Sequence, residues 1–316
     1  MTSNEPSYIR TYEQGLLKKK KAIAGGLLKS CTLCPRKCGV DRLAGETGFC
    51  NTARFTRVSS YAPHFGEEQP LVGNRGSGTI FITHCNLLCL FCQNFDISHQ
   101  GAGQEVTDNN LADMMLALQN QGCHNINFVT PSHVVPQILA AVEVAVPQGL
   151  NVPLVFNTGG YDRVATLKLL EGVFDIYMPD FKFWDSQVAE DSCQAGDYPE
   201  VARRALAEMH RQVGDLQMDE AGRAWRGLLI RHLVLPGDLA GTRDIMRFIA
   251  QKISPDSYVN IMSQYRPCGR AAEVRGLDSH LSPADYKNAV RAAMQEGITR
   301  LDQPRRQYIF RSPAGG

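Results

Sequence analysis

Residues 79–94, TIFITHCNLLCLFCQN, join a short apolar run to three closely spaced cysteines. The apolar run has the β-branched and aromatic composition of a buried strand in a parallel sheet. Cys85, Cys89 and Cys92 follow it at once, and no fourth cysteine lies nearby in the sequence. A structural zinc site needs four closed ligands, whereas a metal centre that performs chemistry keeps one position open. The stretch therefore predicts a reactive metal centre at the carboxyl end of a strand.

Strand and helix patterns alternate along the rest of the chain. Apolar, β-rich runs occupy 79–83, 125–130, 153–157, 174–178, 228–235 and 258–262, as expected of buried parallel strands. Helical patterns cover 110–121, 134–146, 163–170, 200–213 and 242–252, and a last helix begins at Ser282 with Pro283 in its first turn. This alternation predicts an α/β fold, either a (β/α) barrel or an open doubly wound sheet.

The residues at the strand ends favour the barrel. Five of the six ends carry metal-ligating, charged or amide side chains, in segments 84–85, 130–133, 157–159, 180–182 and 264–265. Barrel enzymes place their chemistry at this face, whereas an open sheet with a crevice at its strand ends is the alternative. We expect a partial (β/α)6 barrel at 76–270. The flanking parts are a helical or flexible extension (1–30), a cysteine-rich element with a linker (31–75) and a C-terminal helix and tail (271–316).

Composition narrows the cellular setting and the classes of partner. The 316 residues are 43% hydrophobic and 21% charged, with a formal net charge of +1. This near-neutral balance argues against nucleic acid as a partner. No apolar stretch reaches the roughly 18 residues that a membrane span needs, and the N-terminus lacks the apolar core of a signal peptide. We therefore expect a cytoplasmic protein without a membrane partner, whose ten cysteines are metal ligands rather than disulfides.

The spacing Cys85-x3-Cys89-x2-Cys92, with Phe91 before the last cysteine, resembles the cluster loop of the radical S-adenosylmethionine (SAM) enzymes. The resemblance implies a 4Fe-4S cluster held by three cysteines, SAM bound at the fourth iron, and the partial barrel of that family. Phe91 would lie beside these cofactors. In the family, the reduced cluster cleaves SAM to methionine and a 5′-deoxyadenosyl radical, which abstracts hydrogen from a substrate.

Three later segments extend the resemblance. FDIYMPDFKF (174–183) is similar to the fourth strand of glycyl-radical-enzyme activases such as pyruvate formate-lyase activating enzyme, where an Asp-x-Lys pair contacts SAM. Asp180 and Lys182 match that pair and, as alternate residues, share one strand face. LLIRHLVLPG (228–237) resembles the fifth strand and FNTGGYD (156–162) the third, with Asn157 placed to hydrogen-bond SAM. The alternatives are a rim ion pair for Asp180 and Lys182, and a turn residue for Asn157.

The second and sixth strands depart from the family pattern. Where many radical SAM proteins have a Gly-Gly-Glu element, this chain has Thr130-Pro131-Ser132-His133. The hydroxyls of Thr130 and Ser132 are candidate contacts for the SAM ammonium. His133 is a candidate SAM contact, a proton donor to substrate, or a polar residue at a helix N-terminus. After the sixth strand, Tyr265 is a candidate SAM contact, with core packing as its alternative.

Four more cysteines precede the predicted barrel, in the pattern Cys31-x2-Cys34-x3-Cys38-x11-Cys50. Interleaved glycines permit tight turns, so the four thiolates can surround one ion or cluster. The spacing fits both zinc and an auxiliary 4Fe-4S cluster, with a structural metal preferred. A similar element precedes the cluster loop in a branch of radical SAM proteins labelled by homology to pyruvate formate-lyase activating enzymes. The remaining cysteines are expected to be buried or idle thiols: Cys123, Cys193 and Cys268.

Together these features predict a radical SAM enzyme whose substrate the sequence does not identify. A protein or peptide substrate is preferred, as in glycyl radical enzyme activation, and a flavodoxin or ferredoxin is the expected reductant. The alternative is a non-catalytic iron-sulfur or zinc protein for electron transfer or partner binding. A zinc site in the cysteine loop would be completed by His84 or His99, although His84 is expected to face away from Cys85 as its strand neighbour. A zinc-stabilised nucleic-acid binder predicts a basic face, which the net charge opposes.

Overall fold

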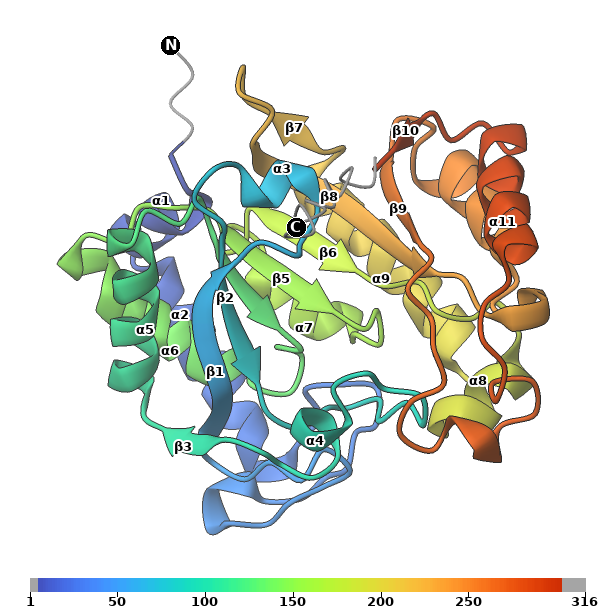
Figure 1. Cartoon of the computed structure of the whole chain (residues 1–316). Helices are drawn as coiled ribbons and strands as arrows, with labels where there is room; N and C mark the ends of the chain where they lie inside the picture. Colours follow the sequence, from blue (N-terminus) through green and yellow to red (C-terminus); the bar gives the residue numbers. More distant parts are fainter. Residues whose placement is uncertain (1–4, 303–316) are drawn as a thin grey trace, which may run out of the picture.

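The six apolar runs predicted as strands all form strands in the computed structural model, which describes residues 5–302. They are β2 (Ser77–Ile82), β4 (Ile126–Val129), β5 (Leu154–Thr158), β6 (Ile176–Pro179), β8 (Ala224–Leu233) and β9 (Tyr258–Met262). Each pairs in parallel with the next of these strands along the chain (Figure 1). The α/β class and the parallel pairing are therefore confirmed.

Four further strands complete a ten-stranded sheet. They are β1 (Thr56–His64), β3 (Gln104–Val106), β7 (Gln217–Met218) and β10 (Arg300–Leu301). The order across the sheet is β10-β9-β8-β6-β5-β4-β2-β1-β3, and β7 pairs with β8 off this path. Among the described residues the two edge strands, β10 and β3, do not pair, so the sheet is open. The linker expected within 31–75 contains β1, which pairs antiparallel with β2 as part of this sheet.

The helices are α1 (Ser7–Glu13), α2 (Leu16–Gly26), α3 (Gln69–Val72), α4 (Phe95–Ser98), α5 (Asp108–Asn120), α6 (Val135–Ala145), α7 (Val164–Leu170), α8 (Ser186–Cys193), α9 (Tyr198–Val213), α10 (Thr242–Phe248) and α11 (Pro283–Gln295). Of these, α1 and α2 precede the sheet, α3 joins the antiparallel strands β1 and β2, and the other helices follow β2. The predicted helix at 242–252 is α10 continued by a π-helical turn, Ile249–Ile253. Along residues 5–302, no helix combines the length and apolar character that crossing a membrane requires.

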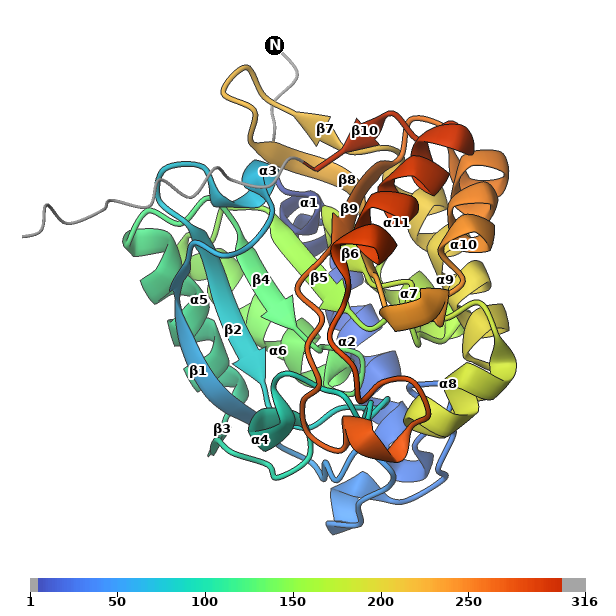
Figure 2. The same cartoon turned by 45° about the vertical axis from the view of Figure 1, so that its right-hand side comes forward.

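Local signals explain where the helices begin and how they pack. At the start of α11, Ser282 and Asp285 form a capping box, as expected from the serine and proline there. Thr107 and Asn110 do the same for α5. Helix α5 packs against α6, α2 against α6 and α7, and α7 against α9. These helices follow the strand order along one face of the sheet (Figure 2).

Side-chain alternation in the strands divides the apolar core in two. On the helix-covered face, Phe128 and Phe156 join the main core. On the opposite face, a small apolar cluster includes Met178 and Leu229 and is completed by Leu71 of α3. Figure 1 shows α3 at one end of the strands and α4 at the other. The small cluster forms an apolar floor, and residues further along the same strands face the space above it.

Candidate functional site

The three cysteines lie in a turn that follows β2. The strand ends at Ile82, and His84 and Leu88 adopt left-handed backbone conformations with φ of 71° and 52°. The expectation that His84 faces away from Cys85 as a strand neighbour is therefore wrong, because both residues lie beyond the strand. All three cysteines, and His84, line one cavity of about 390 Å³ at the carboxyl ends of the parallel strands. Cavities of this size are typical of small-molecule sites.

Hydrogen bonds reach two of the cysteine sulfurs. Leu87 N donates to Cys85 Sγ at 3.3 Å, and Ser98 Oγ donates to Cys92 Sγ at 3.3 Å. Burial raises the pKa of Cys85 to about 12 and also raises the pKa of Cys92. A buried thiolate needs a compensating positive charge, which a bound metal supplies. The other predicted zinc ligand, His99, instead contacts Ser98 Oγ through Nδ1 at 2.8 Å.

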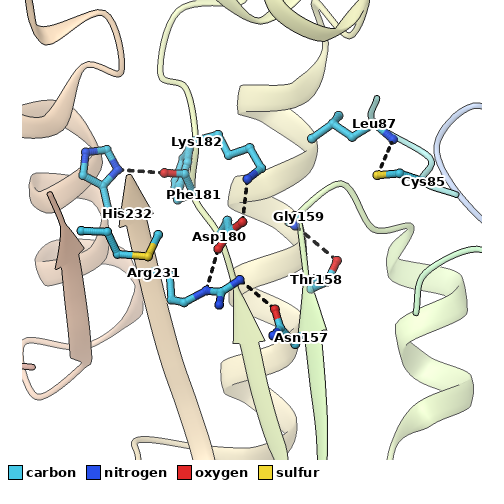
Figure 3. A network of polar contacts seen from close by, with 12 residues as sticks. Cys85, Leu87, Asn157, Thr158, Gly159, Asp180, Phe181, Lys182, Arg231 and His232 are labelled. Carbon is cyan, nitrogen blue, oxygen red and sulfur yellow. Dashed lines mark hydrogen bonds and ion pairs between the residues drawn. The ribbon is translucent and has the colours of Figure 1, made fainter. Parts of the chain in front are cut away.

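An ion-pair network lies beside the cysteine loop (Figure 3). Lys182 Nζ donates to Asp180 Oδ2 at 2.6 Å, and Arg231 Nε donates to Asp180 Oδ1 at 2.8 Å. Arg231 Nη2 also donates to Asn157 Oδ1 at 2.7 Å. Burial disfavours the Asp180 carboxylate, but Arg231 and Lys182 outweigh burial and lower its pKa. Burial likewise disfavours the Lys182 ammonium, and the charge of Asp180 nevertheless raises its pKa.

Strand register sets these polar side chains on one face. Asn157, Asp180 and Arg231 each come two residues after a member of the apolar floor, so they point to the same side of the sheet. The turn after β5 then passes close to β6. Gly160 in this turn has a φ of 79°, and a Cβ there would lie 2.2 Å from the carbonyl oxygen of Asp180. Glycine is therefore required at this position.

Two further predicted residues line the same cavity, and one does not. Phe91 and Thr130 are among the lining residues. The ring of Phe91 packs edge-on against Phe183 and Tyr265, with centroids 5.9 Å apart in both pairs. Tyr265 itself lies behind this ring, and its hydroxyl donates to the carbonyl oxygen of Leu277. Tyr265 therefore takes the core-packing role that was its alternative.

Ser132 and His133 lie outside the cavity of the cysteine loop. Ser132 Oγ is 3.0 Å from Thr158 Oγ1, which donates to Asp162 Oδ2 at 2.6 Å, and burial raises the pKa of Asp162 to about 6. His133 is buried just before α6, with Nε2 3.0 Å from the carbonyl oxygen of Thr83. Burial lowers the pKa of His133 to about 3, so its imidazole is neutral. Of its three expected roles, the position before a helix is the one that matches.

The four N-terminal cysteines surround a second, small cavity. Cys31, Cys34, Cys38 and Cys50 all line it, together with His133. The amide of Phe49 donates to Cys38 Sγ at 3.4 Å. The fold thus brings together the four cysteines that were predicted to share a site. Nevertheless, within residues 5–302 no three His, Cys, Asp or Glu side chains are arranged closely enough to hold a single metal ion.

Several residues of the site were missed by the sequence reasoning. Arg231 joins Asp180 to Asn157, and its signal was a charge inside the apolar run 228–235. Glu67 also lines the cavity, 3.8 Å from Arg231, and no local pattern marks it. Cys193 is buried, as expected, and its Sγ donates to the carbonyl oxygen of Ala189 at 3.0 Å. What the sequence reasoning missed is its effect on Cys89, since Cys193 and burial together raise the pKa of Cys89.

Comparison with known proteins identifies a relative along most of the chain. No family model matches the sequence. The chain is 30% identical over 297 residues to the uncharacterized protein MJ0674 of Methanocaldococcus jannaschii. The match covers 92% of this chain and 81% of that protein. It establishes kinship along nearly the full length and carries no activity with it.

Proposed function

This chain belongs to the same family as protein MJ0674, and we propose that it is a radical SAM enzyme built on a partial (β/α)6 barrel. One observation carries the proposal. Cys85, Cys89 and Cys92 line a single cavity with the side chains of Asn157 and of the Asp180–Lys182 pair. The three cysteines follow β2, whereas Asn157 and the Asp180–Lys182 pair come from β5 and the end of β6. An electron carrier has no need of these polar side chains beside its cluster. Their meeting in one cavity therefore favours an enzyme.

The consecutive order of the parallel strands supports the partial barrel. From β2 to β9, each parallel strand neighbours the next one in the sequence, as in a (β/α) barrel. A doubly wound sheet instead reverses its strand order at a switch point. No reversal occurs among these six parallel strands. The sheet is open between its edge strands β10 and β3, which is compatible with a barrel of six units that does not close.

The donor set fits a 4Fe-4S cluster better than a single zinc ion. Cluster cysteines bind three different irons, so their sulfurs need not converge on one point. Donors at Leu87 N and Ser98 Oγ suit sulfurs that carry negative charge. The cavity of about 390 Å³ leaves room for a ligand beside the cysteine loop.

When bound, the cluster and SAM would supply reductive cleavage to methionine and a 5′-deoxyadenosyl radical that abstracts hydrogen from a substrate. The protein's own residues bind and orient. Lys182 has donors left after its bond to Asp180, and these suit the methionyl carboxylate. Asp180 keeps Lys182 charged, and Asn157 is an amide partner held by Arg231. Phe91 lines the cavity, and its apolar ring would help to exclude water.

The N-terminal cysteine element belongs to the same proposal. Four cysteines around one small cavity suit a closed metal centre, either zinc or an auxiliary 4Fe-4S cluster. Arg42 is buried at its edge, where Nη1 lies 3.9 Å from Cys31 Sγ and donates to the carbonyl oxygen of His133 at 2.7 Å. A flavodoxin or ferredoxin as reductant and a cytoplasmic setting complete the proposal, with a protein or peptide as the preferred substrate.

SAM binding at the reduced cluster tests the proposal. Anaerobically reconstituted protein is reduced, and its electron paramagnetic resonance spectrum is recorded while SAM is added. We expect SAM to change the spectrum, and Lys182→Met to weaken apparent SAM affinity about tenfold or more, since it removes a charge-assisted hydrogen bond. Lys168→Met is the matched control, because Lys168 is exposed on α7. A cluster spectrum that ignores SAM would contradict the proposal.

A further inference from the structure

A third cavity, here called the second cavity of the sheet face, opens beside the cysteine-loop cavity. It has a volume of about 700 Å³ and lies between the segment 65–69 and β9, on the side where the sheet is open. Glu67, Arg231 and Met262 line both cavities. A molecule in the second cavity of the sheet face therefore adjoins whatever occupies the cysteine-loop cavity. The position suits the substrate of the proposed reaction, because the reacting partners must be neighbours.

Among the described residues that line this cavity, Glu68 has a buried side-chain oxygen without a hydrogen-bond partner. Its Oε1 accepts a hydrogen bond from Asn260 Nδ2 at 2.7 Å. Its Oε2 is buried and has no hydrogen-bond partner among the described residues, and the residue is only 5% exposed. An unpaired buried carboxylate oxygen costs stability, so its presence calls for an explanation, and a ligand that completes its hydrogen bonding is one. Glu68 is among the residues that line the cavity, and rotation of its carboxyl group would present the unpaired Oε2 to an incoming donor.

The charge of the lining favours a cation. Three carboxyl groups line the cavity, those of Glu67, Glu68 and Asp302. Arg231 is the basic residue among the described lining residues, and its guanidinium is already engaged by Asp180. Burial raises the pKa of Glu68, and Arg231 acts against this effect. A second positive charge in the cavity would favour the ionised carboxylate in the same way.

We propose that this cavity binds the part of the substrate that carries an aliphatic ammonium group, with Glu68 Oε2 as its acceptor. The inference rests on the proposed function, because a molecule in this cavity is a substrate only if the adjoining cavity is the SAM site. The ammonium donates to Glu68, while Glu67 and Asp302 lower the cost of bringing its charge out of water. A free amine and a lysine side chain share this chemistry.

Binding of matched probes tests the inference without any SAM chemistry. Ligand-observed nuclear magnetic resonance compares pentylamine with pentanol, and N-acetyl-lysine amide with N-acetyl-norleucine amide, on the full chain. Within each pair the probes have similar chains and differ in the ammonium. We expect each ammonium probe to bind about tenfold more tightly than its neutral partner, as for a charge-assisted hydrogen bond. A preference confined to pentylamine would indicate a small amine as the substrate, and a preference shared by the lysine probe would indicate that a peptide also fits.

Three variants locate the effect. Glu68→Gln is expected to abolish the preference, and Asp302→Asn, on another wall, to reduce it. Glu220→Gln is the matched control at an exposed carboxylate and is expected to keep the preference. Glu68→Gln is also expected to leave the melting temperature unchanged or raised, because it removes a buried charge. A purely structural Glu68 predicts the reverse, a lower melting temperature with the preference kept.

The outcomes separate the two proposals. Equal binding within each pair, no saturable ammonium binding, or a preference that survives in Glu68→Gln overturns the inference. If the preference behaves as expected while SAM has no effect on the reduced protein, the proposed function fails and the ammonium site stands. If SAM changes the spectrum of the reduced protein and the ammonium probes show no binding preference, the proposed function stands and this site assignment fails.

Discussion

Asp180 holds two cations at the rim of the cysteine-loop cavity. Its carboxylate oxygens accept from Lys182 and Arg231, and all three side chains are less than a fifth exposed. A buried carboxylate between two cations is stabilising as a set, and removing the anion leaves two like charges close together. The arrangement of the rim therefore depends on this one residue.

We predict that Asp180→Asn lowers the free energy of unfolding by about 3–5 kcal/mol, the usual cost of breaking a buried ion pair. Urea denaturation measures the change. The matched control is Glu200→Gln, which removes one partner of an exposed helical pair with Arg204 and is expected to cost about 1 kcal/mol or less. Equal effects in the two variants would show that the rim network is not a coupled unit.

At the residue scale, local sequence signals singled out side chains that the structure places together. The three cysteines lie near one another in the sequence, as do Asp180 and Lys182, and all of them line one cavity. Arg231 and Glu68 were not predicted, because their roles depend on pairing across strands distant in sequence. Two of the roles expected of His133 would place it in the cysteine-loop cavity, and it lies outside that cavity. The chain turns away after β4 at Thr130, which has a φ of 62°.

At the scale of elements, the turn after β5 is the tightest junction of the site. Gly160 brings the backbone of this turn against β6, where a side chain would meet the carbonyl oxygen of Asp180. Tyr198 at the start of α9 fastens the same region, since its hydroxyl lies 3.0 Å from the carbonyl oxygens of both Gly159 and Asp180. Strand, turn and helix are therefore fixed together at the rim.

A pair of glycine substitutions tests this junction. Gly149→Ala, at a φ of 96° with no atom within 4 Å of the new Cβ, is expected to cost about 1–2 kcal/mol from backbone strain alone. Gly160→Ala adds a collision with the backbone, so we predict a clearly larger loss of unfolding free energy and weaker SAM binding. Denaturation curves of the two variants provide the comparison. Similar losses would mean that the turn has room to move.

The elements that the sequence revealed are those buried on both faces. Such strands read as continuous apolar runs, and all six were found. β1 was missed because it contains exposed polar residues and Pro63, and it joins the sheet antiparallel at the outer side of β2. β3, β7 and β10 have two or three residues each, too few for any periodic pattern.

At the scale of the whole molecule, the N-terminal cysteine element is fastened to the α/β core. Thr166 Oγ1 donates to the carbonyl oxygen of Leu33 at 2.6 Å, and Arg163 Nη1 to that of Thr32 at 2.7 Å. Arg36 Nε donates to the carbonyl oxygen of Asn86, in the cysteine loop, at 3.0 Å. Because these bonds join the element to the site, the loss of a metal from the proposed four-cysteine centre is expected to destabilise the whole fold.

We predict that Cys38→Ser removes one metal centre and lowers the melting temperature by about 5 °C or more, since metal binding contributes to folding. Cys38 is exposed, so its substitution alone has little effect on a protein without metal. Elemental analysis and calorimetry measure both effects, with Cys268→Ser as the control. An unchanged metal content in Cys38→Ser would exclude the four-cysteine centre.

The central claim is reductive cleavage of SAM, and product analysis tests it most directly. The protein is reconstituted anaerobically with iron and sulfide, reduced with dithionite and given SAM, and 5′-deoxyadenosine is quantified. Cys89→Ala removes one proposed cluster ligand, and Cys123→Ala removes a buried cysteine outside both cysteine groups. We predict 5′-deoxyadenosine from the wild type and from Cys123→Ala, and none from Cys89→Ala. Absence of the product from wild-type protein that holds its iron would contradict the account.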